Sequence, residues 1–461
     1  MHLRLSGADL PARSESDLLY PVTTERSRLR ELGRALFPLG RDADTADPEQ
    51  SDARPLFGAR CFVAPFEATA DVWKPQRPEG WAAVLVREGA SIKESYLREA
   101  AFLDYCFEGC GARPEKIFIH HVSKAYERDG ELDPQQLLVE RDVTRRARNL
   151  RVVVESELEG LARELAEDPR LERYRDVACS RPQTCPVCSA DLPMADAHHV
   201  STLHRGGPLV EQLIADGITS IQEIPIERLS HPRQEIQQRV VSERRAHVDR
   251  EALAQFLGRL REPVFYLDFE ATSSAIPPFD RVRPWEHVPY LYSLHREEPE
   301  AEPAHMTFIM EPGTDARYEM VERLVADAGG DGSVVVYSAG FERGILRRLA
   351  ETVPERQREL HELGERIVDL LDPFNEFSFY HHDQKGKVSL KAVLPVLADR
   401  DYSGERVQDG YTANLVYRYL SEQHVTGEER KRLMSDLMSY CAMDTMAMVH
   451  IVRELRRLAH E

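Results

Sequence analysis

The stretch PVFYLDFEATSSAIPPFD, residues 263–280, decides the fold of the C-terminal part of this chain. Its first half is rich in aromatic and β-branched residues that favour a buried strand, and Pro263 marks the entry to that strand. Because side chains at i and i+2 of a strand point to one face, Asp268 and Glu270 project together. Two buried acids repel each other, and two divalent cations would offset that penalty. The alternative is a common tripeptide at a water-facing strand end.

Further carboxylates follow at intervals along the chain. An apolar strand over residues 334–337 leads into a helix that begins near Glu342. Residues 438–455 have apolar positions at helical spacing, and Tyr440 and Asp444 lie four apart on one face of that helix. Taken singly, Asp444 could be a solvated helix acid and Tyr440 a core aromatic. Neither alternative accounts for the ordered set of strand DxE, strand-to-helix Glu and helical YxxxD.

This ordered set resembles the DEDD exonuclease superfamily, which has an RNase H-like fold, in its tyrosine-containing subgroup. More closely, several segments from about residue 251 to the C-terminus are similar to the bacterial family called domain of unknown function 2779, and the resemblance is weaker over the rest. These segments are LDFEATSSAIPPFDRVRPWEHVPYLYSLH, VVYSAGFERGIL, RIVDLLDPF, FYHHDQKGKVSLKAVLPVL and LMSYCAMDT. The resemblance implies that two Mg²⁺ or Mn²⁺ ions bind the four carboxylates, with Tyr440 positioning the attacking water. The ligands are Asp268, Glu270, Glu342 and Asp444. One residue departs from the pattern, because the superfamily usually has Asp where this chain has Glu342, which puts metal affinity and rate in doubt.

The resemblance therefore implies a metal-dependent phosphodiesterase, a 3′-to-5′ exonuclease on single-stranded DNA or RNA that uses two metals. Four residues are candidates for nucleic-acid binding: Arg283, Trp285, Lys387 and Lys391. Trp285 offers a stacking surface, or it anchors its loop. The lysines flank a turn into a helix N-terminus that could seat a phosphate, or they belong to a surface loop with a capped helix. The alternative function is a catalytically inactive nucleic-acid-binding or assembly protein.

Length and composition limit the classes of protein that this chain can belong to. Its 461 residues predict two or three domains, and 42% hydrophobic residues are enough for packed cores. There is no run of eighteen apolar residues and no apolar signal segment, so we expect a cytoplasmic protein with no membrane association. Seven cysteines argue against a disulfide framework. The net charge of −19 speaks against a generic nucleic-acid coat, because phosphate binding needs local positive charge.

The predicted organisation is α/β in four parts. Residues 1–55 are expected to form an N-terminal helix and an acidic loop, and residues 176–255 a cysteine cluster and helical connector. The order of strands and helix in residues 56–175 resembles the RecB-like, restriction-endonuclease-like core, and the family resemblance implies an RNase H-like mixed sheet flanked by helices for residues 256–461. The RecB-like core needs an Asp on one strand and an acid-x-Lys on the next. Asp71 fits the first place, but Leu85 and Arg87 occupy the second. Leucine cannot bind a metal and arginine cannot act as a neutral base, so we expect this second site to be degenerate.

A cysteine cluster lies between the two nuclease-like parts. Cys179, Cys185 and Cys188 are spaced C-x5-C-x2-C, and His198 follows. Three thiolates and one imidazole can form a tetrahedral zinc site. The relatives instead imply an iron–sulfur cluster, although the cysteine spacing here differs from theirs. A third interpretation is an eroded site without metal, and the three stay open.

Overall fold

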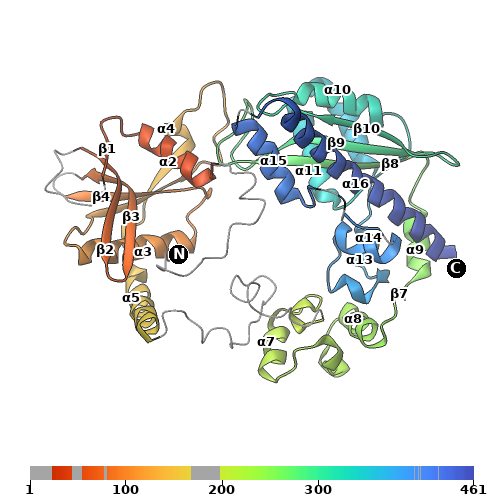
Figure 1. The fold of residues 1–461 in the computed structure, drawn as a ribbon, viewed down its shortest axis with the longest axis horizontal. Helices are drawn as coiled ribbons and strands as arrows, with labels where there is room; N and C mark the ends of the chain where they lie inside the picture. Colours follow the sequence, from red (N-terminus) through yellow and green to blue (C-terminus); the bar gives the residue numbers. More distant parts are fainter. Residues whose placement is uncertain are drawn as a thin grey trace. The chain divides into compact units, whose positions relative to one another are not determined.

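The computed structural model describes residues 23–43, 54–76, 80–167, 198–398, 400–402, 404, 406–423 and 425–460. These residues form a mixed α/β protein with two units, each of which has its own sheet (Figure 1). The first unit contains the described residues up to 167 together with residues 273–287. The second contains residues 198–272 and the described residues from 288 onwards.

A six-stranded sheet in the order β1-β2-β3-β4-β5-β6 forms the first unit. Its strands are β1 (Arg41–Asp42), β2 (Leu56–Val63), β3 (Phe66–Pro75), β4 (Trp81–Arg87), β5 (Lys116–Val122) and β6 (Leu138–Asp142). The pairs β2–β3, β3–β4 and β5–β6 are antiparallel, whereas β1–β2 and β4–β5 are parallel. The parallel step from β4 to β5 requires a crossover, and α3 (Glu94–Gly109) supplies it.

Successive side chains of β4 point to opposite faces of this sheet, and both faces are packed. Ala83 and Leu85 join the core under α3 and α5 (Thr144–Glu167), where the rings of Trp73 and Phe107 lie 5.0 Å apart. On the opposite face Val86 packs with Leu29 of α2 (Glu25–Ala35). Ala275 and Ile276 belong to the same apolar cluster, as does α4 (Pro134–Leu137) through Leu137. The helix α2 and the segment 273–287, which the sequence-based division assigns to other domains, therefore pack with this unit.

The sheet of the second unit has the order β10-β9-β8-β11-β12. Its strands are β8 (Val264–Ser273), β9 (His287–Glu297), β10 (Ala304–Ile309), β11 (Ser333–Val336) and β12 (Ile367–Asp369). The strand β8 is central, and it pairs in parallel with β11, which in turn pairs in parallel with β12. The β9–β10 pair is antiparallel. The first half of β8 is buried from Val264 to Leu267, as its apolar sequence predicts.

Helices flank this second sheet. The helix α16 (Gly427–His460) packs against β10 and against α9 (Arg250–Leu257), α14 (Leu390–Ala398) and α15 (Gly410–Glu422). The helix α10 (Arg317–Ala328) packs against β10, α11 (Ala339–Thr352) and α12 (Gln357–Glu365), and α13 (Asp372–Asn375) follows β12. The long α16 carries a continuous row of buried apolar residues, which matches the helical spacing of its sequence.

Smaller elements complete the second unit. They are α7 (Gly207–Ala215), α8 (Pro232–Glu243), the antiparallel pair β7 (His247–Val248) and β13 (Phe379–Tyr380), and the 3-10 helices η3 (Val200–Thr202), η4 (Ile221–Glu223), η5 (Ile226–Arg228), η6 (Pro354–Arg356) and η7 (His382–Gln384). The pairing of β7 with β13 joins residues of the predicted helical connector to the predicted catalytic domain. None of the described helices combines the length and the apolar character that crossing a membrane requires.

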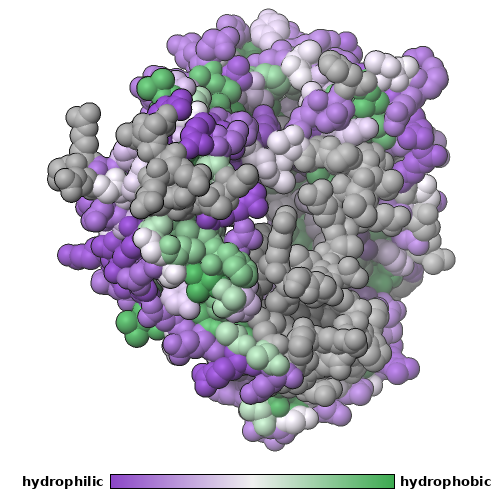
Figure 2. Space-filling view, turned by 60° about the vertical axis from the view of Figure 1, so that its left-hand side comes forward, coloured by the Kyte–Doolittle hydropathy of each residue, from purple (hydrophilic) through white to green (hydrophobic). Residues whose placement is uncertain are grey.

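The described residues on the face shown in Figure 2 are mainly polar. In Figure 2, which brings the left-hand side of Figure 1 forward, hydrophilic residues surround a few gatherings of hydrophobic ones. Among the described residues of the first unit, the large apolar side chains that are exposed are Leu39, Phe62, Val152, Val153 and Trp285. Scattered exposed apolar residues are normal on a protein surface.

Candidate metal centre

The central strand β8 presents two carboxylates on one face. Asp268 and Glu270 are separated by Phe269, which is buried on the other face of the sheet. Both acids are partly buried, and each can place a carboxylate oxygen within 4.8 Å of the others in a group of three acids. The strand position thus brings the two acids together, as the i, i+2 spacing predicts.

The third acid of this group is Asp444 from α16. A carboxylate oxygen of Asp444 lies within 4.8 Å of those of Asp268 and Glu270. Tyr440, one helical turn earlier, is buried and makes a side-chain hydrogen bond to Asp444. The shared face of the helix therefore carries both residues into the same site.

Glu342 supplies a fourth carboxylate beside the group. It lies in the first turn of α11, which follows β11, and its side chain is only 2% exposed. Its Oε2 atom is buried and has no hydrogen-bond partner among the residues that the structure describes. Burial, followed by the negative charge of Asp268, raises the pKa of Glu342 from 4.5 to about 9. A buried carboxyl oxygen without a partner is costly, which makes Glu342 a candidate ligand.

Asp369 holds the start of α11 in place. Its two carboxylate oxygens accept hydrogen bonds from the backbone N–H groups of Ser338 and Ala339, at 2.9 and 2.8 Å. Ser338 has a left-handed backbone with φ of 80°. Asp369 thus caps the helix that carries Glu342, and its Oδ1 also accepts a hydrogen bond from the backbone N–H of Leu371 at 3.0 Å, just before α13.

The carboxylates of the group resist losing their protons. Burial and then the charge of Asp444 raise the pKa of Asp268 well above its usual range, and burial and then Asp268 do the same for Glu270. Burial also raises the pKa of Asp444. Like charges this close cannot all ionise without a compensating cation. The site therefore favours either bound protons or positive charge.

Lys391, near the start of α14, provides part of that positive charge. Its ammonium group lowers the pKa of Asp268, Glu270 and Asp444 against the raising effect of burial. Its Nζ atom donates hydrogen bonds to the hydroxyl oxygen of Tyr440 at 3.0 Å and to the backbone carbonyl of Gln408 at 2.5 Å. Lys391 therefore contacts Tyr440 itself, a placement more specific than the phosphate seat expected from the sequence.

Three residues of the site were missed by sequence reasoning: Tyr290, Tyr402 and Cys441. The Tyr402 hydroxyl donates a 2.5 Å hydrogen bond to Oδ1 of Asp444, and the Cys441 thiol lies 3.3 Å from Oδ2 of Asp268. Cys441 could have been noticed, because it lies between Tyr440 and Asp444 in the sequence. Tyr402 follows α14 in a segment without periodic pattern, so no local signal identifies it.

Tyr290 of β9 adds a second polar atom without a partner. Its ring stacks on that of Tyr417 with centroids 3.9 Å apart, and its hydroxyl is buried with no hydrogen-bond partner among the described residues. After burial, the charge of Glu270 contributes most to raising the pKa of Tyr290. A hydroxyl and a carboxyl oxygen without partners thus lie around the same acids.

The other predicted nucleic-acid-binding residues have different surroundings. Arg283 and Trp285 pack within the first unit: the Arg283 Nε atom donates to Oε2 of Glu127 at 3.0 Å, and the Trp285 indole N–H donates to the carbonyl of Glu88 at 2.9 Å. Trp285 has a left-handed backbone with φ of 64° and is 37% exposed. The Trp285 contact is that of a loop anchor. Lys387 is exposed on the second unit.

The expected degenerate site of the first unit contains an ion-pair network. The Arg87 guanidinium is 1% exposed and contacts Oδ2 of Asp71 at 2.6 Å and Oε1 of Glu99 at 2.7 Å. Arg30 reaches the other oxygen of Asp71 at 2.6 Å, and Arg26 reaches Glu99 at 2.7 Å. Both acids are therefore neutralised by arginines, and a guanidinium lies where a metal ligand set would require further carboxylates.

The predicted cysteine site lies largely outside the part of the chain that the structure describes. Cys179, Cys185 and Cys188 fall in residues 168–197, which the structure does not describe, whereas His198 is described. The ring of His198 lies 6.4 Å from that of His382, measured between centroids. The choice among zinc, an iron–sulfur cluster and no metal stays open.

Comparison with known proteins gives a family without an assigned function. Residues 265–389 match the family described as Domain of unknown function (DUF2779). A curated relative, "Uncharacterized protein MG366 homolog" from Mycoplasma pneumoniae (strain ATCC 29342 / M129 / Subtype 1), is 27% identical over 216 residues, which are 42% of this chain. The aligned part covers 32% of the relative, so this chain spans about a third of its length. No solved structure matches the chain.

Proposed function

We propose that the second unit is a metal-dependent nuclease, a 3′-to-5′ exonuclease that acts on single-stranded DNA or RNA. The observation that carries the proposal is the group formed by Asp268, Glu270 and Asp444, whose oxygens lie within 4.8 Å of one another, with the unpartnered Oε2 of Glu342 beside them. The mixed sheet flanked by helices supports the RNase H-like fold that we propose for this unit.

The donor set fits a hard divalent cation. Mg²⁺ and Mn²⁺ favour carboxylate oxygens, and Mg²⁺ keeps several waters while it takes one or two protein carboxylates. Asp268, Glu270, Glu342 and Asp444 would hold the ions. When bound, such ions act as Lewis acids that generate a nucleophilic hydroxide and stabilise the leaving oxygen of a phosphodiester. The pKa values of Asp268, Glu270 and Glu342 are raised by burial and by neighbouring acids, so a bound cation would stabilise their ionised forms.

Tyr440 has the hydrogen bonds of a residue that positions water. Its hydroxyl is bonded to Asp444 and accepts a hydrogen bond from Lys391, which leaves a lone pair that can accept one from a water molecule. Burial and the neighbouring acids raise its pKa, so the hydroxyl stays protonated and is no general base at neutral pH. Lys391 would contact a non-bridging oxygen of the scissile phosphate and balance its charge.

The alternative is a nucleic-acid-binding or assembly protein without catalytic activity. The Asp71–Arg87 ion pair supports it, because a site built on these residues in the first unit would be filled by a guanidinium. Glu342 supports it as well, since the superfamily usually has the shorter Asp at that motif. The two functions differ in one property, because an intact metal centre turns over substrate and a degenerate one does not.

The test is degradation of 5′-labelled single-stranded DNA and RNA by the purified full chain, with Mg²⁺, Mn²⁺ or EDTA. Asp268→Asn removes one ligand charge at nearly constant volume. Glu355→Gln, on the exposed η6 turn of the same unit, is the matched control. We expect a metal-dependent ladder of shortening products with the unsubstituted chain and the control, and none with Asp268→Asn.

Two other outcomes would reject the proposal. Absence of cleavage by the folded unsubstituted chain with either metal would favour the binding function. Equal cleavage by the unsubstituted chain and Asp268→Asn would place the activity in the first unit or in a contaminant. Labelling the 3′ end instead of the 5′ end distinguishes the two polarities.

A further inference from the structure

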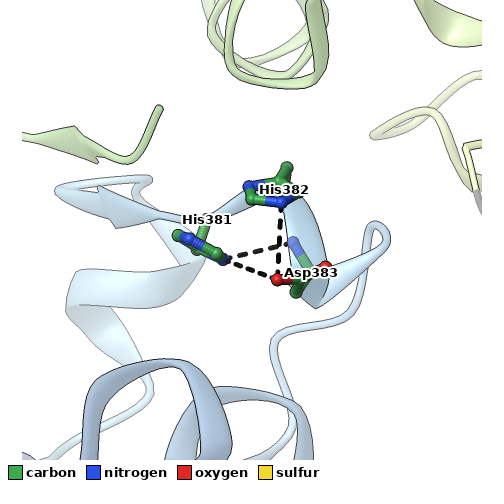
Figure 3. Close-up of side chains that lie close together, drawn as sticks. All are labelled: His381, His382 and Asp383. Carbon is green, nitrogen blue, oxygen red and sulfur yellow. Dashed lines mark hydrogen bonds and ion pairs between the residues drawn. The ribbon is translucent and has the colours of Figure 1, made fainter. Parts of the chain in front are cut away.

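A second group of ligand-type side chains lies in the second unit, at the 3-10 turn η7. His381, His382 and Asp383 are consecutive, and each offers an atom within 4.8 Å of the others (Figure 3). Oδ2 of Asp383 lies 3.4 Å from Nε2 of His382 and 3.7 Å from Nδ1 of His381. The centroids of the two imidazole rings are 4.2 Å apart. Three consecutive residues therefore turn their polar atoms toward one point.

The local backbone fixes this arrangement. Nδ1 of His381 accepts a hydrogen bond from the backbone N–H of Asp383 at 3.2 Å, and the backbone N–H of His381 donates to Oε1 of Gln384 at 2.7 Å. Gln384 is 1% exposed, so this capping box is anchored in the unit. The bond to Asp383 N–H keeps a lone pair on the inward ring nitrogen of His381. A cation bound by this nitrogen would take the place of the hydrogen bond, because the nitrogen has a single lone pair.

The two imidazoles are suited to bind a metal in their neutral form. Nδ1 of His382 is buried and has no hydrogen-bond partner among the described residues. Two neutral imidazoles and one carboxylate form a donor set that zinc favours.

A third imidazole lies next to these residues. The ring centroids of His198 and His382 are 6.4 Å apart, with an interplanar angle of 45°. A zinc ion lies 2.0–2.1 Å from each ligating nitrogen, so two imidazoles that share one tetrahedral ion have centroids about 5.3 Å apart. The observed separation is about 1 Å longer than that, so a rotation of either ring would have to bring the two nitrogens to one ion.

We propose that His381, His382 and Asp383, completed by His198, form a structural site for a zinc-type transition metal ion. Four protein ligands and no open position are typical of structural zinc. The ion would cross-link two segments that already touch, because a Cβ atom at Gly386 would come within 2.3 Å of the Thr202 carbonyl. It would thereby fix the turn that precedes α14, the helix of Lys391. The site is separate from the carboxylate group of β8 and uses none of its residues.

The experiment measures zinc binding and does not depend on nuclease activity. The full chain carries Cys179, Cys185 and Cys188 replaced by serine, and millimolar Mg²⁺ is present so that the carboxylate group does not contribute. Titration calorimetry then measures the affinity and stoichiometry of Zn²⁺ binding to this triple-serine background. The same measurement is made on the background that also carries His382→Ala or Asp383→Asn. His361→Ala, at an exposed position of α12, is the matched control.

We expect one zinc ion per chain in the background and the control, and an affinity lower by about tenfold or more in the other two variants. Asp383 is 58% exposed, so Asp383→Asn keeps the test decisive if His382→Ala does not fold. Zinc binding that is unchanged in Asp383→Asn and in folded His382→Ala would overturn the proposal. Loss of all zinc binding on replacing the three cysteines would also overturn it, because the ion would then belong to the thiols.

Discussion

The hydroxyl of Tyr402 lies 2.5 Å from Oδ1 of Asp444, and the hydrogen bond it donates fixes one oxygen of a candidate metal ligand. A carboxylate oxygen of the same Asp444 lies within 4.8 Å of oxygens of Asp268 and Glu270. Tyr402 is buried, and burial followed by the charge of Asp444 raises the pKa of its hydroxyl, so it donates at any physiological pH. Outer partners of this kind orient ligands without contacting the ion.

Tyr402→Phe should therefore weaken metal binding while the fold is kept. We expect an affinity for Mn²⁺ lower by about 10–100-fold, which is typical of the loss of a residue that orients a ligand. The measurement is the rise in melting temperature as Mn²⁺ is titrated. Tyr318→Phe, at a 59% exposed tyrosine of α10, should leave that titration unchanged. An unaltered Mn²⁺ titration in Tyr402→Phe would show that Asp444 does not depend on this bond.

Lys391→Met should lower nuclease activity and also destabilise the metal-free protein. The ammonium group is the cation that lowers the pKa of three acids in the site, so its loss leaves their repulsion uncompensated. We expect a rate lower by about 10²–10³-fold, the cost of removing one charge-stabilising group. Degradation rates in Mn²⁺ and melting temperatures in EDTA measure the two effects.

Lys387→Met is the control for that experiment, because both lysines were predicted to bind nucleic acid. Lys387 is exposed, and among the described residues it makes no hydrogen bond or ion pair with the acids of the candidate metal centre. We expect its replacement to raise KM without lowering kcat and to leave the melting temperature in EDTA unchanged. Equal loss of kcat in both variants would contradict the specific role of Lys391.

The strand and helix patterns of the second unit could be predicted because each side chain's position follows from a local period. Asp268 and Glu270 share a face through the period of a strand, and Tyr440 and Asp444 through the period of a helix. The helix α16 is observed over Gly427–His460, and the apolar strand expected at residues 334–337 is observed as Ser333–Val336. Local periods do not show that this strand and this helix pack together in the folded protein. That packing was expected from the order of the motifs and from the family resemblance.

Other features depend on contacts between distant segments and had no local signal. Tyr402 lies 42 residues from Asp444, and Asp369 reaches back 30 residues to Ala339. Packing of residues 273–287 with the first unit depends on Ala275 and Ile276 meeting Leu29 and Val86, which no short pattern indicates. The pairing of β7 with β13 likewise joins residues more than a hundred positions apart. The period of a strand or helix predicts on which face of that element a residue lies. Contacts between distant segments determine which other element packs against that face.

Glu342→Gln should stabilise the metal-free protein, and increasingly so as the pH rises. The pKa of Glu342 is raised from 4.5 to about 9 on folding, so the folded state holds a proton that the unfolded state releases in that range. The unsubstituted chain therefore loses stability as the pH rises from about 4.5 to about 9, and the glutamine variant lacks this loss. At pH 7 in EDTA we expect the free energy of unfolding to be higher by about 1–3 kcal/mol in the variant.

Urea unfolding at several pH values in this range measures the difference between the two proteins. In Mn²⁺ the order should reverse, because only the unsubstituted chain has the fourth carboxylate to offer to a cation. Glu355→Gln should follow the unsubstituted chain under all conditions. A difference that stays constant with pH would mean that Glu342 is ionised in the folded state.

Arg87→Met should destabilise the first unit without changing the activity of the second. The guanidinium neutralises Asp71 and Glu99 in a position that is 1% exposed, so its removal leaves buried negative charge with fewer partners. Breaking one side of a buried ion pair costs about 3–5 kcal/mol, although Arg30 and Arg26 still contact these acids and should reduce that cost.

Lys116→Met is the control, because it removes an exposed ion pair with Asp142 and should cost no more than about 1 kcal/mol. Urea unfolding measures both costs, and degradation rates of the folded variants should equal that of the unsubstituted chain. A rate that falls with Arg87→Met while folding is retained would mean that the first unit takes part in catalysis, and that Asp71 and Arg87 do more than neutralise each other.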